Sequence, residues 1–95
     1  MQKGMLAMPV ISVFYGIRIY IYVERGGKHN VPHIHAFYGE DAISVDFDGN
    51  VLDGSLPRKK QAMVIAWVMM HEEELKANYE LMLDGQTPFR IEPLK

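Results

Sequence analysis

The chain has 95 residues, of which 48% are apolar, so it is long enough for one small folded domain and too apolar for a disordered tail. It contains no cysteine, which excludes disulfides and thiolate metal sites and is typical of a reducing compartment. The formal net charge of −2 excludes nucleic-acid binding through overall charge, but leaves room for a local basic patch. No apolar run reaches the roughly 18 residues of a membrane span, so we expect a cytoplasmic protein without membrane contact.

The first half of the chain is typical of β-strands separated by turns. We expect residues 1–7 to form a flexible lead-in and residues 8–95 to form a single domain. Strands are predicted over residues 10–15, 17–23, 33–38 and 42–48, with a brief pairing at 51–52, because these segments are rich in β-branched and aromatic residues and several alternate in polarity. Residues 24–32 contain two glycines and a proline and are predicted to be a loop.

The alternation predicts which side chains face a core. The apolar face holds Ile17, Ile19, Ile21, Val23, Ile34, Ala36, Ile43, Val45 and Phe47. The opposite face holds Arg18, Tyr20, Tyr22, His33, His35, Phe37, Ser44 and Asp46. Aromatic, histidine and charged residues are an unusual mixture for a face that only contacts water, since lysine, glutamate and threonine are missing from it.

The second half changes to a helical pattern. No glycine or proline occurs between Arg58 and Leu83, which predicts one helix of about 26 residues or two helices with a break near His71. Residues 87–95 form a tail, of which 89–91 are candidates for pairing with a sheet edge. Strands that precede helices predict an α+β fold, with an antiparallel sheet of four to five strands packed on one face by one long or two shorter C-terminal helices.

Residues 62–70 are apolar on almost every side of the predicted helix. Met63, Trp67 and Met70 lie on a different side from Val64 and Val68, and a helix on a sheet buries only one stripe. We therefore expect a homo-oligomer, a dimer for example, or a protein partner to cover the surplus. The alternative is a second helical half that folds back over the first.

His33 and His35 are the leading candidates for chemistry. Residues i and i+2 of a strand share a face, so both rings project together. With Arg18 they form a candidate catalytic set for metal-free acid–base chemistry on a phosphate, and Tyr20, Tyr22 and Asp46 are candidate binding residues. Alternatively, the same residues form a surface for a partner protein. A metal site needs further ligands, and only His29, Asp46 and His71 are available, so we expect no metal and no cofactor.

Arg58, Lys59 and Lys60 begin the predicted helix, where the helix dipole is already positive. They are candidate phosphate-binding residues, and a solvated basic turn is the simpler alternative. His71 precedes three glutamates without the spacing of a zinc protease. We expect His71 to be hydrogen-bonded beside the core, in line with Trp67, Leu75 and Tyr79.

Several short motifs resemble those of the bacterial domain-of-unknown-function family 4160. They are Met8-Pro9-x-Ile11-Ser12, Phe14-Tyr15-Gly16, Pro32-His33-x-His35-Ala36, Tyr38-Gly39-Glu40, Gly54-x-Leu56-Pro57-Arg58, Trp67, His71-x-Glu73-Glu74-Leu75, Asn78 and Ile91-x-Pro93-Leu94. Val31 stands where the family usually has a first proline, and residues 26–29 are longer than usual.

The resemblance implies a small bacterial protein that is encoded beside a second small domain and is associated with toxin–antitoxin pairs. We therefore expect one component of a toxin–antitoxin-like module that acts through a protein partner encoded nearby, with RNA as a candidate target. The alternatives are a non-catalytic protein-binding module, or a metal-dependent enzyme that uses the His-x-His pair.

Overall fold

The computed structural model describes residues 9–23 and 31–95 of the chain. The lead-in expected for residues 1–7, most of the loop expected over 24–32, and His29 lie outside the described residues. Five strands precede two helices: β1 (Val10–Phe14), β2 (Ile17–Tyr22), β3 (His33–Tyr38), β4 (Asp41–Asp46), β5 (Val51–Gly54), α1 (Arg58–Met70) and α2 (Glu72–Leu83). The predicted α+β fold is confirmed.

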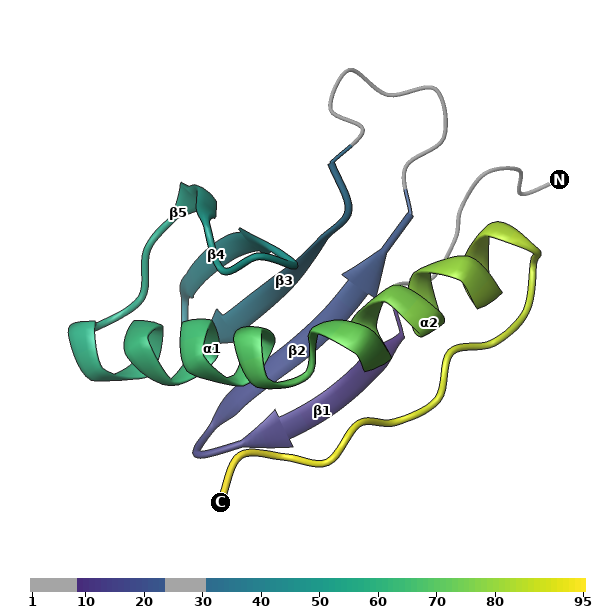
Figure 1. Cartoon of the computed structure of the whole chain (residues 1–95). Helices are drawn as coiled ribbons and strands as arrows, with labels where there is room; N and C mark the ends of the chain where they lie inside the picture. The colour runs from purple at the N-terminus through teal and green to yellow at the C-terminus, as the bar shows by residue number, and fades with distance from the viewer. Residues whose placement is uncertain (1–8, 24–30) are drawn as a thin grey trace, which may run out of the picture.

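The strands form one antiparallel sheet in the order β1-β2-β3-β4-β5, and both helices lie across the same face of it (Figure 1). Strand ends differ from the predicted ones by one or two residues. β4 ends at Asp46 rather than at Asp48, because Asp46 Oδ1 accepts hydrogen bonds from the backbone N–H groups of Asp48 (3.0 Å) and Asn50 (2.8 Å). These bonds close the turn between β4 and β5 earlier than the sequence pattern indicated.

The helix-facing side of the sheet is the core, as the alternation predicted. Cross-strand pairs such as Ile21 with Ile34 and Ala36 with Ile43 stack buried side chains across the central strands. All of the residues assigned to the apolar face are buried: Ile17, Ile19, Ile21, Val23, Ile34, Ala36, Ile43, Val45 and Phe47. Full burial of one such aliphatic side chain contributes about 1.5–3 kcal/mol, so this face supplies most of the stabilising burial.

Gly54 explains one of the short motifs in physical terms. Its φ is +79°, and a Cβ placed there would lie 2.2 Å from the carbonyl oxygen of Ala42. Only glycine therefore permits β5 to stay paired with β4 at this point. Leu56 then enters the core, and Gln61 Oε1 accepts a hydrogen bond from its backbone N–H at 3.0 Å. This contact ties the start of α1 to the chain that leaves the sheet.

The helical region is divided at His71, the position where a break was considered. His71 has φ −115° and ψ 26°, which are not helical values, and α2 resumes at Glu72. The second helix continues beyond the first instead of folding back over it (Figure 1). Within the described residues, neither helix is long and apolar enough to cross a membrane.

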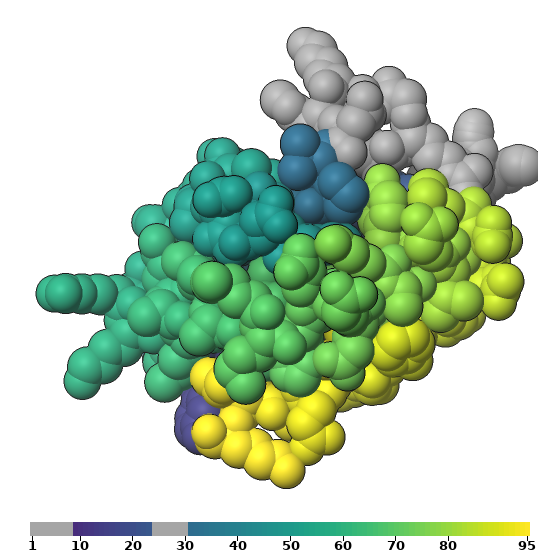
Figure 2. Space-filling model, in the orientation of Figure 1, coloured from purple at the N-terminus to yellow at the C-terminus, as the bar shows by residue number. Residues whose placement is uncertain are grey.

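The C-terminal tail, rather than the second helix, covers Trp67. The tail runs along β1 and passes below the helices (Figures 1 and 2). Trp67 is fully buried, and its Nε1–H donates to the carbonyl oxygen of Glu92 at 2.9 Å. Met63 packs against the core, whereas Met70 is 67% exposed. Two of the three side chains expected to need an external partner are thus accommodated by the chain itself.

The tail is attached to the sheet edge and to α2 by hydrogen bonds. The backbone N–H of Ile91 donates to the carbonyl of Ile11 at 2.8 Å, and Ser12 Oγ donates to the carbonyl of Ile91 at 3.0 Å. The side chain of buried Asn78 forms two bonds of 2.9 Å with Phe89, one from Nδ2 to the carbonyl and one to Oδ1 from the N–H. The predicted pairing of residues 89–91 with a sheet edge is therefore limited to this single backbone bond.

Asn78→Ala should destabilise the chain by about 1–3 kcal/mol, because both backbone groups of Phe89 lose a partner at a buried position. Urea denaturation followed by circular dichroism measures this change. Gln86→Ala removes an exposed amide from the same region and should leave the midpoint unchanged. Equal midpoints for the two variants would contradict the role given to Asn78.

Removal of residues 89–95 should uncover Trp67, the only tryptophan of the chain. Its fluorescence emission should shift to longer wavelength under native conditions, because the indole then contacts water. An unchanged emission maximum in a shortened chain that remains folded would show that the tail does not shield Trp67 from solvent.

Candidate functional site

The face of the sheet opposite the helices is the candidate functional site. We call it the open face, and its members are Arg18, Tyr20, Tyr22, His33, His35, Phe37, Ser44 and Asp46. Arg18 is exposed and the others are partly exposed, as the alternation predicted. No described helix or tail segment lies over this side of the central strands (Figure 1).

Aromatic rings on neighbouring strands pack against one another across the open face. The Tyr20 and Phe37 rings meet edge to face with centroids 5.4 Å apart, and the Tyr22 and His35 centroids are 6.0 Å apart. The guanidinium of Arg18 lies 5.7 Å from the centre of the Phe37 ring. These contacts hold the side chains in place before any ligand binds. The side chains therefore lose less conformational entropy on binding.

His33 and His35 project from the same side of β3, as predicted. Their ring centroids are 4.9 Å apart. His33 Nδ1 lies 2.7 Å from the carbonyl oxygen of Val31, which favours the tautomer that donates from Nδ1 and leaves Nε2 as acceptor. His35 Nδ1 lies 3.2 Å from Ser44 Oγ. Each imidazole is therefore oriented by a hydrogen bond at Nδ1.

The two arginines proposed as phosphate ligands lie at different distances from these histidines. Arg18 pairs with Phe37, which lies two residues along β3 from His35 and four from His33, or about 7 Å and about 13 Å along the strand. Tyr20, by contrast, pairs directly with His35. Arg58 begins α1 in the helical layer, on the other side of the sheet. The structure thus brings together His33, His35 and the tyrosines, with Arg18 diagonal to His35 on the neighbouring strand, and it separates them from Arg58.

Asp46 pairs with His33 across the strands, but its carboxylate is already used in the turn that follows. Oδ1 accepts two backbone N–H groups, and Oδ2 accepts the Asn50 side chain at 3.2 Å. The predicted binding role of Asp46 therefore competes with a structural one. Among residues 9–23 and 31–95, no three histidine or carboxylate side chains gather as a metal ligand set. The His-x-His pair has no third ligand there.

Of the three basic residues at the start of α1, Lys60 is anchored by contacts within the chain, and Arg58 and Lys59 are solvated. Lys60 Nζ donates to the carbonyl of Tyr15 at 3.0 Å and lies 4.9 Å from the centre of the Tyr38 ring. Arg58 and Lys59 are exposed, and side chains at this end of α1 extend far from the surface (Figure 2). A shared phosphate site would have to compete with the contacts of Lys60.

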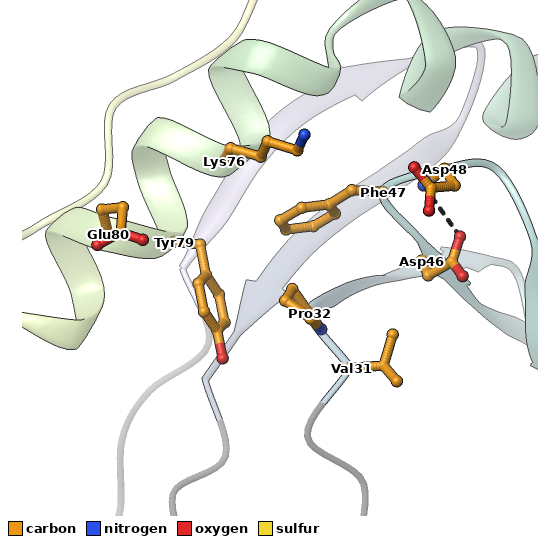
Figure 3. Close-up of a pocket in the computed structure, with 8 residues that line it drawn as sticks. All are labelled: Val31, Pro32, Asp46, Phe47, Asp48, Lys76, Tyr79 and Glu80. Carbon is orange, nitrogen blue, oxygen red and sulfur yellow. Dashed lines mark hydrogen bonds between the residues drawn. The ribbon is translucent and has the colours of Figure 1, made fainter.

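A shallow pocket of about 360 Å³ lies where β3 begins and β4 ends, under α2 (Figure 3). Its lining is Val31, Pro32, Asp46, Phe47, Asp48, Lys76, Tyr79 and Glu80. Phe47 and Tyr79 form its aromatic wall with centroids 6.1 Å apart. Lys76 bonds Glu72 at 3.1 Å, and this hydrogen bond and charge raise the pKa of Lys76. The pocket could not be predicted from the sequence, because α2 meets the end of the sheet only in the folded chain.

His71 lies outside this site, beside the core, as expected. Its ring is 5.1 Å from that of Trp67, and Nδ1 lies 2.5 Å from Glu74 Oε1. The contact with Glu74 satisfies the imidazole within the bend between α1 and α2. His71 is therefore accounted for by packing and hydrogen bonding.

Lys60→Gln should lower the free energy of unfolding by about 0.5–1.5 kcal/mol, because it removes a carbonyl partner and a cation–π contact. Arg58→Gln and Lys59→Gln change exposed cations of the same helix turn and should have almost no effect. Thermal denaturation of the three variants tests this difference. Equal stability of all three variants would show that Lys60, like Arg58 and Lys59, is a solvated cation that does not stabilise the fold.

Comparison with known proteins yields one family match. A family described as a domain of unknown function, DUF4160, matches residues 16–80, which include β2, β3, β4 and the open face. No curated protein and no solved structure matches the chain. The matched region extends over more than half of the sequence and contains the Pro32-His33-x-His35-Ala36 motif. The chain therefore belongs to the DUF4160 family.

Proposed function

We propose that the chain is one component of a bacterial, cytoplasmic, two-protein module of the toxin–antitoxin type, and that it binds its protein partner through the open face. The observation that supports this proposal is a row of partly exposed aromatic and histidine side chains on the central strands, with no described segment covering it. Protein interfaces are enriched in such residues, which contribute large contact areas and hydrogen-bonding edges.

The composition of the open face favours a protein over RNA. Arg18 is the only arginine or lysine in β2, β3 and β4. Single-stranded nucleic acids are held by stacking together with a positively charged groove, and one cation on a face that also carries Asp46 supplies little of that charge. The rings of Tyr20 and Phe37 also pack edge to face, which leaves fewer flat ring faces for bases.

RNA remains the second candidate target because of the paired histidines. Two imidazoles 4.9 Å apart are suited to acid–base catalysis on a phosphodiester, with one ring as base and the other as acid. Arg58 opposes it, because Arg58 lies in the helical layer and leaves Arg18, which is diagonal to His35 and packs against Phe37, as the cation that would stabilise phosphate charge there. A protein interface requires no such cation and agrees better with the geometry.

His33→Ala combined with His35→Ala should weaken binding of the protein encoded by the neighbouring gene at least tenfold. The isolated chain should keep nearly the same melting temperature, because both side chains lie on the open face and not in the core. Isothermal titration calorimetry with the purified neighbour protein measures the affinity. Glu73→Ala, at an exposed position in the helical layer, is the matched control and should bind normally.

Three experimental outcomes distinguish partner binding from RNA cleavage as the function of the open face. Growth arrest on expression, relieved by the neighbouring gene and lost in the double variant, supports the module. Cleavage of a uridine-rich oligonucleotide that disappears in the double variant would favour the RNA reading. Normal affinity in the double variant would contradict a role of the open face in partner binding.

A further inference from the structure

Within residues 9–23 and 31–95, the outer edge of β5 is another surface that no strand or helix covers. The sheet order leaves β1 and β5 as its two edges. The tail occupies the edge of β1 through the bond from Ile91 to Ile11. All four residues of β5 are exposed, and no described segment pairs with its outer side. An exposed strand edge is a template for another strand.

Apolar side chains accompany this free edge. Val51 and Leu52 of β5 are 41% and 44% exposed. Met69 of α1 is 60% exposed and packs against the turn before β5, since a Cβ at Gly49 would meet its Cγ at 2.9 Å. A shallow pocket beside Leu56 and Ile65 continues the surface along α1. We call these exposed apolar residues of β5 and α1 the apolar strip.

The ends of this strip carry opposite charges. Exposed Asp48 precedes β5, and exposed Arg58 and Lys59 follow it at the start of α1. When two copies of such a strand pair antiparallel, the beginning of each lies beside the end of the other. The acidic end of one copy then meets the basic end of its mate at both sides of the axis, so the strip is complementary to itself.

We propose that β5 pairs antiparallel with β5 of a second copy of the chain, about a two-fold axis through Leu52, to form a ten-stranded sheet. This register places the two Leu52 side chains opposite each other and keeps the two Asp53 carboxylates apart, because like charges directly opposite destabilise a sheet. Because the contact is two-fold symmetric and uses the β5 edge of both copies, the assembly closes at two copies and does not extend into a fibre. The open face lies on another surface, so the inference does not depend on the proposed function.

The oligomeric state of the purified full chain gives the first test. Light scattering should give twice the mass of 10.9 kDa at micromolar concentration. Leu52→Glu should raise the dissociation constant at least 100-fold, because it sets two carboxylates face to face. Val13→Glu alters an equally exposed residue of the opposite edge strand, 45% exposed, and should remain dimeric. A monomer at all soluble concentrations, or a dimeric Leu52→Glu chain, would overturn the proposal.

Crosslinking and charge reversal test the geometry without relying on the folding of one variant. The chain has no cysteine, so Leu52→Cys introduces a single thiol. Under mild oxidation it should form a covalent dimer at least tenfold faster than Val13→Cys. Asp48→Lys should weaken the dimer, and Asp48→Lys with Arg58→Glu and Lys59→Glu should restore it. Equal crosslinking rates, or no recovery in a folded charge-reversed chain, would contradict the antiparallel pairing.

Discussion

The alternation of side chains along β2, β3 and β4 is the constraint on which the structure depends. Each strand directs every second residue toward the helices, so buried pairs such as Ile21 with Ile34 require Tyr22 and His33 to project from the other side. A register shift of one residue would bury the histidines and expose the isoleucines. The core and the open face are therefore two consequences of one pattern, and neither can change without the other.

Much of this pattern could be predicted from the sequence, because strand alternation is a local property. The buried residues of the central strands and the shared face of His33 and His35 were anticipated and are confirmed. The cover over Trp67 was not anticipated, since it depends on a tail that contacts the helix from 25 residues away. Helical periodicity identified the surplus apolar side, for which we expected a second copy, a partner or a folded-back helix, and the tail supplies part of that cover.

The candidate site also differs from the predicted one, because it depends on contacts between residues that are far apart in the sequence. Spacing along one strand correctly placed the histidines together, but no sequence signal showed that Arg18 would pack against Phe37, diagonal to His35. The carboxylate of Asp46 was available in the sequence and is occupied in the turn. The open face is therefore an aromatic surface with few charges, whose rings already pack against one another. Such a surface suits recognition of a folded partner better than chemistry on a phosphate.

Accessibility of the open face in the isolated chain tests this account most directly. Nuclear magnetic resonance with a soluble paramagnetic gadolinium chelate should broaden ring signals of Tyr20, Tyr22 and His35 strongly. It should leave the methyl signals of Ile19 and Ile34, which are fully buried, sharp. Addition of the partner protein should then protect the rings selectively. Ring signals as well protected as the isoleucine methyls in the chain alone would show that the face is already covered and would contradict the account.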